Sequence, residues 1–312
     1  MKKILVTGGA GFIGSNIVEE LIKKENYDVI VYDNFSTGKE ENIKPFLRKI
    51  KLIEGDIENS ALLKKALKNV DYVLHQAALR SVPKSIDNPI NFNNVNVCGT
   101  LNVLLASREM GVKKVVFASS SSVYGSVEKL PIKESFYPKP ISPYSASKLA
   151  AEHYCYVFYK LYNVPTVILR YFNVFGPRQP LETKYAMAIP RFITNMLKNQ
   201  SPPVHDDGEQ SRDFTYVKDI VRANLLALES ENADGEIFNV ASGKRYTILE
   251  LVNCLNSLLK RNIKPTFIAH RKGDVRHTHA DITKIKNLLG YEPSFDFKEG
   301  LSETIQYFEG LK

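Results

Sequence analysis

A chain of 312 residues with 44% hydrophobic and 24% charged residues has the composition of a soluble globular protein, long enough for about two domains. No apolar run approaches the roughly 18 residues of a membrane-spanning helix, so we expect no membrane association. The net charge of +8 comes from lysines spread along the chain, without basic runs interleaved with aromatic residues, and nucleic-acid binding is not expected.

Cysteine and histidine usage argues against a structural metal or a disulfide framework. The three cysteines show no CxxC spacing, which also favours a cytoplasmic protein. His270, His277 and His279 lie close together in sequence, but no cysteine or carboxylate completes a convincing set of ligands. We therefore expect no metal site.

Residues 1–171 alternate short β-branched runs with longer helical stretches. This alternation is typical of parallel strands joined by crossover helices, and strands apolar on both faces are expected where helices cover both sides of the sheet. The predicted fold class is therefore α/β, with a doubly wound parallel sheet. The strands are expected over 3–7, 28–32, 51–54, 72–75, 114–118 and 165–170, and the helices over 11–24, 60–67, 89–111 and 144–162.

The pattern changes from residue 172 onwards. Proline, glycine and polar turn residues concentrate in 172–214, around one helix expected over 189–198. A helix and a strand ending at 236–241 resume the earlier pattern, followed by a helix over 248–259, a strand over 265–269 and a final helix. We expect a larger domain of residues 1–171 plus 215–240, interleaved with a smaller α/β domain of 172–214 plus 241–312.

A glycine-rich turn, Gly8-Gly9-Ala10-Gly11-Phe12-Ile13-Gly14, lies between the first strand and the first helix. Gly8 permits the tight turn, Gly11 lets the backbone approach a pyrophosphate, and Gly14 lets the helix pack on the sheet. The N terminus of that helix offers free N–H groups to phosphates. In this strand–turn–helix context the spacing predicts a Rossmann dinucleotide site that includes Phe12 and Ile13.

Acidic and small residues at the ends of the next strands extend this predicted site. Asp33 ends the second strand, where its carboxylate can bind both ribose hydroxyls of an adenosine and repel a 2′-phosphate. This predicts NAD rather than NADP, with Asn34 beside it and Lys39 as the nearest opposing cation. Asp56 and Ile57 follow the third strand and are expected to contact the adenine. Ala77 and Ala78 follow the fourth strand and are small enough for the protein backbone to approach the cofactor.

Tyr144 and Lys148 lie four residues apart in a predicted helix, which puts both side chains on one face. A phenol can exchange a proton with a sugar hydroxyl, and a nearby ammonium stabilises the phenolate. The run 119–122 of four serines follows the fifth strand, at the edge where such sheets bind ligands. We assign Tyr144 as the base, Lys148 as the ribose anchor and the cation that lowers the pKa of Tyr144, and Ser120 as the hydrogen-bond partner of the reacting hydroxyl.

Five motifs follow one another along the chain: Gly8-x-x-Gly11-x-x-Gly14, the serine run before Val123-Tyr124-Gly125, Tyr144-x-x-x-Lys148, Arg170-Tyr171-Phe172-Asn173 and Ser211-Arg212-Asp213-Phe214. In this order they resemble the extended short-chain dehydrogenase/reductase superfamily, and within it the nucleotide-sugar 4-epimerases. The resemblance covers essentially the whole chain. The segments 75–78, 81–85 and 273–277 are especially similar to bacterial and archaeal UDP-N-acetylglucosamine 4-epimerases.

The resemblance implies a UDP-sugar site and one more cofactor contact, Phe172. Asn173 and Arg212 are similar to ligands of the UDP pyrophosphate, a group that arginine binds through two charge-assisted hydrogen bonds. The other positions implied to meet the substrate are Arg80, Ser81, Ser120, Ser121 and Tyr144 around the sugar, Val204 and His205 beside the uracil, Arg271 and Asp274 near the phosphate and ribose, and Thr278.

The implied reaction is internal to the bound sugar. Tyr144 takes the proton from O4 while the C4 hydride passes to NAD, and the 4-keto sugar turns over and receives the hydride on its other face. The related 4,6-dehydratases carry an Asp-Glu pair where this chain has Ser121 and Ser122, and the UDP-glucuronate decarboxylases usually carry a Glu at the position of Ser122. Epimerisation is therefore favoured over dehydration and decarboxylation.

The sequence leaves the sugar open. Thr278 stands where galactose-restricted epimerases carry a bulky tyrosine, which leaves room for a 2-acetamido group. Arg80 stands where the acetylglucosamine enzymes carry a small residue, and an arginine there suits a hydroxyl or the carboxylate of a uronic acid. UDP-Glc/UDP-Gal and UDP-GlcNAc/UDP-GalNAc therefore rank together, followed by UDP-glucuronate.

Helical stretches 94–109 and 144–161 carry apolar residues on more than one face, among them Val103, Leu104, Tyr154, Cys155, Phe158 and Tyr159. Packing within the domain would account for this pattern, and the resemblance implies a homodimer through a four-helix bundle. A module that only senses NAD would lack the tyrosine, lysine or serine of the catalytic set, and this chain has all three.

Overall fold

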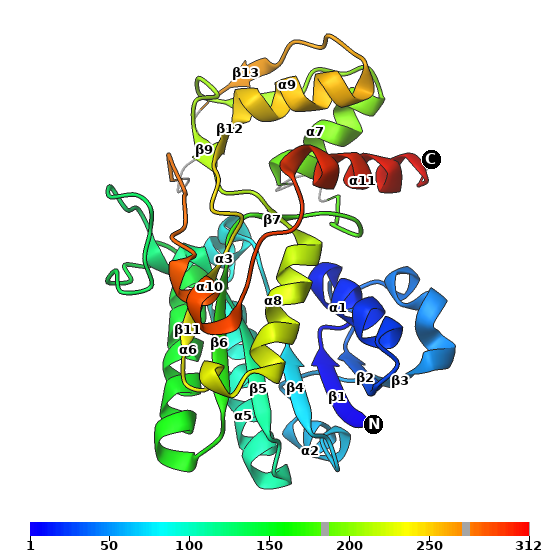
Figure 1. Cartoon of the computed structure of the whole chain (residues 1–312), viewed down its shortest axis with the longest axis vertical. Helices are drawn as coiled ribbons and strands as arrows, with labels where there is room; N and C mark the ends of the chain where they lie inside the picture. Colours follow the sequence, from blue (N-terminus) through cyan, green and yellow to red (C-terminus); the bar gives the residue numbers. More distant parts are fainter. Residues whose placement is uncertain (182–186, 270–274, 312) are drawn as a thin grey trace.

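Seven parallel strands form the central sheet of the computed structural model, which describes residues 1–181, 187–269 and 275–311 (Figure 1). The order β11-β6-β5-β4-β1-β2-β3 places β1 between β2 and β4, so the chain winds outwards in both directions from β1. The predicted doubly wound α/β class is confirmed. The strands are β1 (Lys2–Thr7), β2 (Tyr27–Asp33), β3 (Ile50–Glu54), β4 (Tyr72–His75), β5 (Lys114–Ser120), β6 (Thr166–Tyr171) and β11 (Ile237–Val240).

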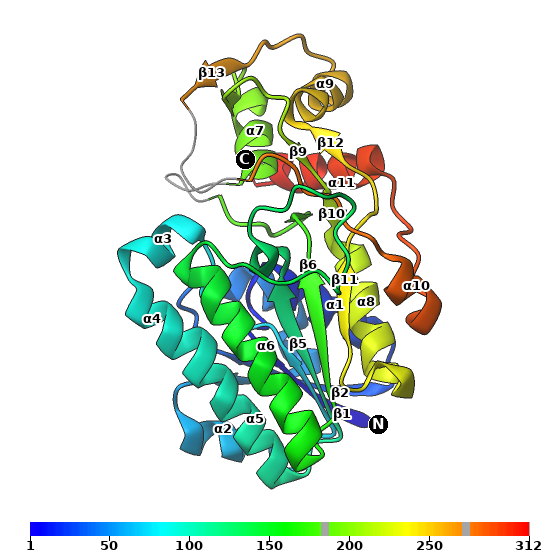
Figure 2. The same cartoon turned by 90° about the vertical axis from the view of Figure 1, so that its left-hand side faces the viewer.

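Helices cover both faces of this sheet, because successive strand residues point to opposite sides and both sides are apolar. Leu5 and Val73 belong to one buried cluster, whereas their neighbours Val6 and Leu74 belong to the other. Figure 2 shows the two helical layers. One contains α1 (Phe12–Lys23), α8 (Val217–Glu229) and α10 (Thr283–Leu289), and the other contains α2 (Ser60–Ala66), α5 (Gly99–Met110) and α6 (Pro143–Tyr162).

The helix predicted over 89–111 is divided in the structure. It consists of α4 (Pro89–Asn93), a π-helical turn η3 (Asn94–Cys98) and α5, and it is preceded by a helix that the sequence analysis missed, α3 (Val82–Asp87). Asn88 separates α3 from α4 and caps the second helix with its side chain. Short π-helical insertions are often found near functional sites, and this one carries the buried residue Asn96.

α6 begins one residue before its predicted start. Ser142 caps it, the side chains and backbones of Ser142 and Ser145 form a reciprocal capping box, and Pro143 occupies the first turn. The helix ends at Asn163, which has left-handed backbone angles. This firm N terminus fixes Tyr144 and Lys148 within the first two turns, at the carboxyl edge of β5.

A smaller lobe sits above the carboxyl edge of the sheet (Figure 1). Its core is a buried cluster in which the aromatic rings of Phe214 and Phe297 stack at 5.5 Å. The lobe contains α7 (Ala188–Leu197), α9 (Ile248–Leu259), α11 (Phe297–Glu309) and the strand pairs β7 (Val174–Phe175) with β10 (Thr215–Tyr216), β8 (Pro203–His205) with β13 (Thr266–Ile268), and β9 (Ser211–Arg212) with β12 (Tyr246–Thr247). The single final helix of the prediction is two helices, α10 and α11.

The predicted domain boundaries stay a prediction. The chain passes between the lobes more than once, and α10 packs against β11 in the sheet lobe although it follows most of the smaller lobe in sequence. Short helical turns complete the described chain: η1 (Glu40–Asn42), η2 (Lys44–Lys49), η4 (Ser121–Tyr124) and η5 (Glu231–Ala233). Among the described residues, none of the helices combines the length and apolarity needed to cross a bilayer.

Candidate active site

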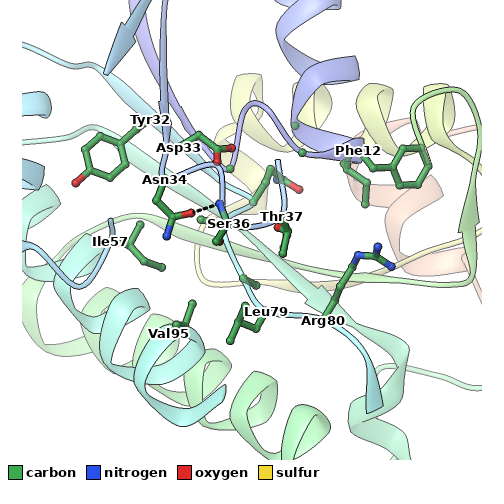
Figure 3. A pocket seen from close by; sticks show the side chains of 18 of the residues that line it. Phe12, Tyr32, Asp33, Asn34, Ser36, Thr37, Ile57, Leu79, Arg80 and Val95 are labelled. Atoms are coloured by element: carbon green, nitrogen blue, oxygen red, sulfur yellow. Dashed lines mark hydrogen bonds between the residues drawn. The ribbon is translucent and has the colours of Figure 1, made fainter. Parts of the chain in front are cut away.

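Most residues predicted to bind the cofactor line one pocket at the carboxyl edge of the sheet (Figure 3). The glycine turn after β1, the ends of β2 and β4 and the first turns of α6 meet there. The predicted residues that line it are Gly8, Gly11, Phe12, Ile13, Gly14, Asp33, Asn34, Asp56, Ile57, Ala77, Ala78, Arg80, Tyr144 and Lys148. Their individual roles stay predictions.

The glycine turn packs so closely on neighbouring backbone that side chains would not fit at Gly8 or Gly14. Gly8 has a φ of +67°, and a Cβ there would lie 2.7 Å from the backbone nitrogen of Ala77. A Cβ on Gly14 would collide with the carbonyl oxygen of Gly8. Gly11 is the N-cap residue of α1, and it has no side chain that could bond the free N–H groups at the start of that helix. The turn therefore fits a pyrophosphate held by backbone N–H groups.

The carboxylate of Asp33 is held rigidly at the end of β2. It accepts hydrogen bonds from the backbone N–H groups of Ala10, at 2.9 Å, and Phe35, at 2.8 Å. Burial raises the pKa of Asp33, and these two hydrogen bonds act in the opposite direction. Beside it, the Asn34 side chain accepts the N–H of Ser36 at 3.0 Å and donates to Asp56 at 2.7 Å (Figure 3). These contacts present acidic groups where the ribose and adenine are expected.

Tyr144 is half-buried where the first turn of α6 lines the pocket. Its ring is edge-on to that of Phe92, with 6.4 Å between the ring centres. Burial raises the pKa of its phenol, because the phenolate loses solvation. A hydrogen bond with Ser120 and the positive charge of Arg80 both lower it. The structure thus brings the predicted serine to the predicted base, although Ser120 itself does not line the pocket, where Ser119 does.

Lys148 lies one turn further along α6 and is only 4% exposed. Its ammonium donates a hydrogen bond to the carbonyl oxygen of Ala118 at 2.8 Å and lies 4.9 Å from the centre of the Phe117 ring. Burial lowers the pKa of Lys148 to about 8. In the described residues, the cation whose charge lowers the pKa of Tyr144 is Arg80; the role of Lys148 as ribose anchor stays a prediction.

A buried ion pair supports this part of α6. Glu152, one turn after Lys148, accepts hydrogen bonds from Arg170 Nε at 2.9 Å and Arg170 Nη2 at 2.6 Å, and a short one from Ser119. Both charged side chains are 3% exposed. The guanidinium also lies over the ring of Tyr124 at 4.6 Å. Glu152 on α6 is therefore linked to β6 through Arg170 and to β5 through Ser119, the first residue of the serine run.

A second pocket lies within the smaller lobe, and three predicted substrate residues line it: Asn173, His205 and Arg212. The Asn173 side chain donates to Thr278 Oγ1 at 2.9 Å, and that oxygen also accepts the N–H of Asp213 at 3.2 Å. Thr278 thereby fixes Asn173, which has a positive φ of 30°. The residues that the sequence analysis missed here include Gln179, Arg191 and Gln210.

Some predicted substrate residues lie elsewhere. Val204 is completely buried in the core of the smaller lobe. Phe172, predicted as a cofactor contact, is completely buried beneath the cofactor pocket, which Tyr171 lines instead. Ser81 caps α3, and Ser121 begins the turn η4. Arg271 and Asp274 lie outside the described residues. No cluster of metal-ligating side chains occurs in the part of the chain that the structure describes.

Comparison with known proteins gives the family. Residues 4–241 match the model of the NAD dependent epimerase/dehydratase family. The chain is 42% identical over 308 residues to a putative UDP-glucose 4-epimerase of Methanocaldococcus jannaschii, covering 98% of each chain.

Two solved structures are also very similar. UDP-N-acetylglucosamine 4-epimerase from Methanobrevibacter ruminantium M1, in complex with UDP-N-acetylmuramic acid, shares 42% identity with a TM-score of 0.95, covering 100% of this chain and 99% of that one. UDP-glucuronic acid 4-epimerase from Bacillus cereus, in complex with UDP-glucuronic acid and NAD, shares 35% identity with a TM-score of 0.93, covering 99% and 100%. The matched glycine turn, the assembled pocket and these relatives lead to one conclusion: the chain belongs to the NAD-dependent epimerase/dehydratase family.

Proposed function

We propose that this protein inverts the C4 hydroxyl of a UDP-hexose through a transient 4-keto sugar. The observation that carries the proposal is that Tyr144 and Lys148 line the same pocket as the glycine turn of Gly8, Gly11 and Gly14. A proton-transfer group beside a dinucleotide cradle suits the paired removal of a proton and a hydride from one secondary alcohol. The named relatives are UDP-sugar 4-epimerases.

The residues of this chain then act in sequence. NAD, when bound, supplies the hydride acceptor. Tyr144 takes the proton from the sugar O4, and Ser120 holds that oxygen through a hydrogen bond. After the 4-keto sugar has turned over, C4 regains its hydride on the opposite face and Tyr144 returns the proton to O4. Arg212 and Asn173, which line the pocket of the smaller lobe, hold the UDP part throughout, because arginine binds pyrophosphate oxygens in a bidentate manner.

The geometry around Thr278 supports neutral hexoses with or without a 2-acetamido group. Its hydroxyl is occupied by Asn173 and Asp213, its side chain is buried, and a threonine has less volume than the tyrosine of galactose-restricted epimerases. A second candidate, epimerisation of a UDP-uronate, is favoured by one observation, the guanidinium of Arg80 in the pocket. Relatives of both kinds occur among the similar proteins.

The test is NMR of the purified protein with UDP-GlcNAc, UDP-Glc and UDP-GlcA in separate samples, without added reductant. Appearance of the C4 epimer from at least one of them supports the proposal, and the relative rates identify the preferred sugar. A protein that binds NAD and UDP but forms no epimer from any of the three would contradict it.

Substitution of Asp33 is expected to change cofactor choice. Asp33→Asn keeps the shape of the side chain but removes the charge that repels a 2′-phosphate, so we expect the preference for NAD over NADP to fall by about tenfold or more. Calorimetric titration with each dinucleotide measures this ratio. The matched control is Asp28→Asn on the same strand, whose carboxylate pairs with Lys3 at the molecular surface. An unchanged ratio in the Asp33 variant contradicts the assigned role.

We also propose a homodimer through α5 and α6, which lie side by side on the outside of the sheet lobe (Figure 2). Of the apolar residues noted in the sequence, Val103, Leu104, Cys155 and Phe158 face the core, which leaves Tyr154 exposed and Tyr159 half-buried. Leu105, Val157 and Leu161 are exposed as well. Such a surface on two adjacent helices favours pairing with a second copy.

Two charges on this surface are expected to separate the dimer. We expect Val157→Glu combined with Leu161→Glu to yield a monomer in light scattering coupled to size-exclusion chromatography, because the carboxylates would be desolvated in the interface. Leu288→Glu on α10, also at an exposed apolar position, should leave the mass unchanged. A wild-type protein that elutes as a monomer at micromolar concentration would exclude the proposed dimer.

A further inference from the structure

Arg80 is a charged residue of the cofactor pocket that takes no part in the proton and hydride transfers of the proposed epimerisation. It is half-buried on the loop between β4 and α3 and lines the same pocket as Tyr144 and Lys148. Figure 3 shows its guanidinium at the end of the pocket opposite Tyr32 and Ile57, away from the expected adenine position.

The loop that carries Arg80 is tied to the first turns of α6. Asn96, 1% exposed, accepts the N–H of Leu79 at 2.8 Å and donates to the carbonyl of Leu79 at 3.0 Å. The same amide donates to Ser147 Oγ at 3.0 Å, and the Ser147 hydroxyl donates to the carbonyl of Tyr144 at 2.8 Å. One buried side chain therefore fixes the residue before Arg80 relative to the helical turn that carries Tyr144.

The residue after Arg80 is held in an unusual backbone conformation. Ser81 has a φ of 97°, which is rare for a residue with a side chain, and its hydroxyl caps α3 by accepting the N–H of Lys84. Such conformations persist only where the surroundings fix them, and they concentrate at functional sites. The backbone on both sides of Arg80 is thus constrained, and the approach of its charge to the pocket is built into the fold.

The other charged and titratable groups around Tyr144 already have different tasks. On α6, Lys148 donates to Ala118, and Glu152 is paired with Arg170. On β4, burial lowers the pKa of His75 to about 3, so it is neutral near neutrality. α4 has no charged residue, and the charged residues of α3, Lys84 and Asp87, are exposed. The positive charge of Arg80 lowers the pKa of the Tyr144 phenol, in the same direction as the Ser120 hydrogen bond.

We propose that Arg80 is a positioning residue that stabilises the phenolate of Tyr144 and so extends proton abstraction to lower pH. The free enzyme releases the phenolic proton to solvent, and the resulting phenolate takes the O4 proton of the sugar. This inference rests on the proposed function only in giving Tyr144 the role of base. A positive charge near a phenol favours its ionised form regardless of the substrate.

The first experiment observes the phenolate directly and needs no turnover. The ultraviolet absorbance of the NAD-loaded protein is titrated with pH, and the signal of Tyr144 is isolated by subtracting the same titration of the Tyr144→Phe variant. In the Arg80→Gln background, paired with its own Tyr144→Phe reference, we expect this signal to move to higher pH. Arg80→Lys keeps the charge and should titrate like wild type, as should Lys84→Gln on the exposed face of α3. A Tyr144 titration that is unchanged in Arg80→Gln overturns the proposal.

The second experiment measures kcat/KM across pH with the sugar identified by NMR. For Arg80→Gln we expect a loss of about fivefold at pH 6 and of no more than about twofold at pH 9, because phenolate is abundant at high pH in both proteins. An equal loss at every pH shows that Arg80 only binds cofactor or substrate, and overturns the proposal. If no sugar is epimerised but the absorbance shift is seen, the proposed function fails while the inference on Arg80 stands.

Discussion

Replacement of Tyr144 by phenylalanine is expected to lower kcat by about a thousandfold, because a positioned general base contributes roughly 10²–10⁴ in rate. The hydroxyl is the only group removed, and the ring contact with Phe92 can be kept by phenylalanine. The measurement is steady-state epimerisation followed by NMR, together with calorimetric titration of UDP. We expect the dissociation constant for UDP to change by less than about twofold, since the residues proposed to bind UDP line the other pocket.

The matched control for this substitution is Tyr156→Phe, three turns further along the same helix, where the side chain is 48% exposed. It should retain the wild-type kcat. A Tyr144→Phe enzyme with unaltered kcat would mean that another group takes the O4 proton, and Ser120 would then be the next residue to substitute.

Loss of the Arg170 guanidinium is expected to destabilise the protein by about 3–5 kcal/mol. Arg170→Met leaves the carboxylate of Glu152 buried with Ser119 as its remaining described partner, and an unpaired buried charge is among the most destabilising changes known in proteins. Urea unfolding followed by circular dichroism measures the loss, provided that the slope with denaturant concentration stays unchanged.

An exposed ion pair supplies the comparison. Lys23→Met breaks the pair with Glu19 on α1, where the lysine side chain is 61% exposed, and we expect a change below about 1 kcal/mol. Adding Glu152→Gln to Arg170→Met should restore part of the stability, because it removes the orphaned charge. Equal losses for Arg170→Met and Lys23→Met would show that the buried pair is not a significant source of stability.

Much of the fold could be predicted because its signals are local. Each strand of the sheet is a short apolar run, and the glycine turn after β1 has a spacing that only a few structures use. Helix α3 was missed because its six residues are too few to show a full hydrophobic period, although Ser81 and Pro83 are typical of a helix start. The π-helical turn at 94–98 was missed because no local pattern distinguishes it from the α-helices on either side.

The site was predictable to the extent that its residues follow strands. Tyr144, Lys148 and Asp33 stand at strand ends or at the start of a crossover helix, where doubly wound sheets bind ligands. Arg191 and Gln179 come from the smaller lobe, whose position over the sheet depends on contacts between distant segments. The burial of Val204 depends in the same way on the pairing of β8 with β13, more than 60 residues apart in sequence.

The strand order also has a consequence for synthesis of the chain on the ribosome. β6 pairs with β5 on one side, but its other edge is covered only by β11, which follows the first segment of the smaller lobe and α8 in sequence. Until residues 237–240 leave the exit tunnel, the nascent sheet exposes an unpaired, apolar parallel edge, the kind of surface that captures other unfinished chains. The nascent protein therefore passes through a stretch of translation in which binding by a chaperone at this edge would do most to prevent aggregation.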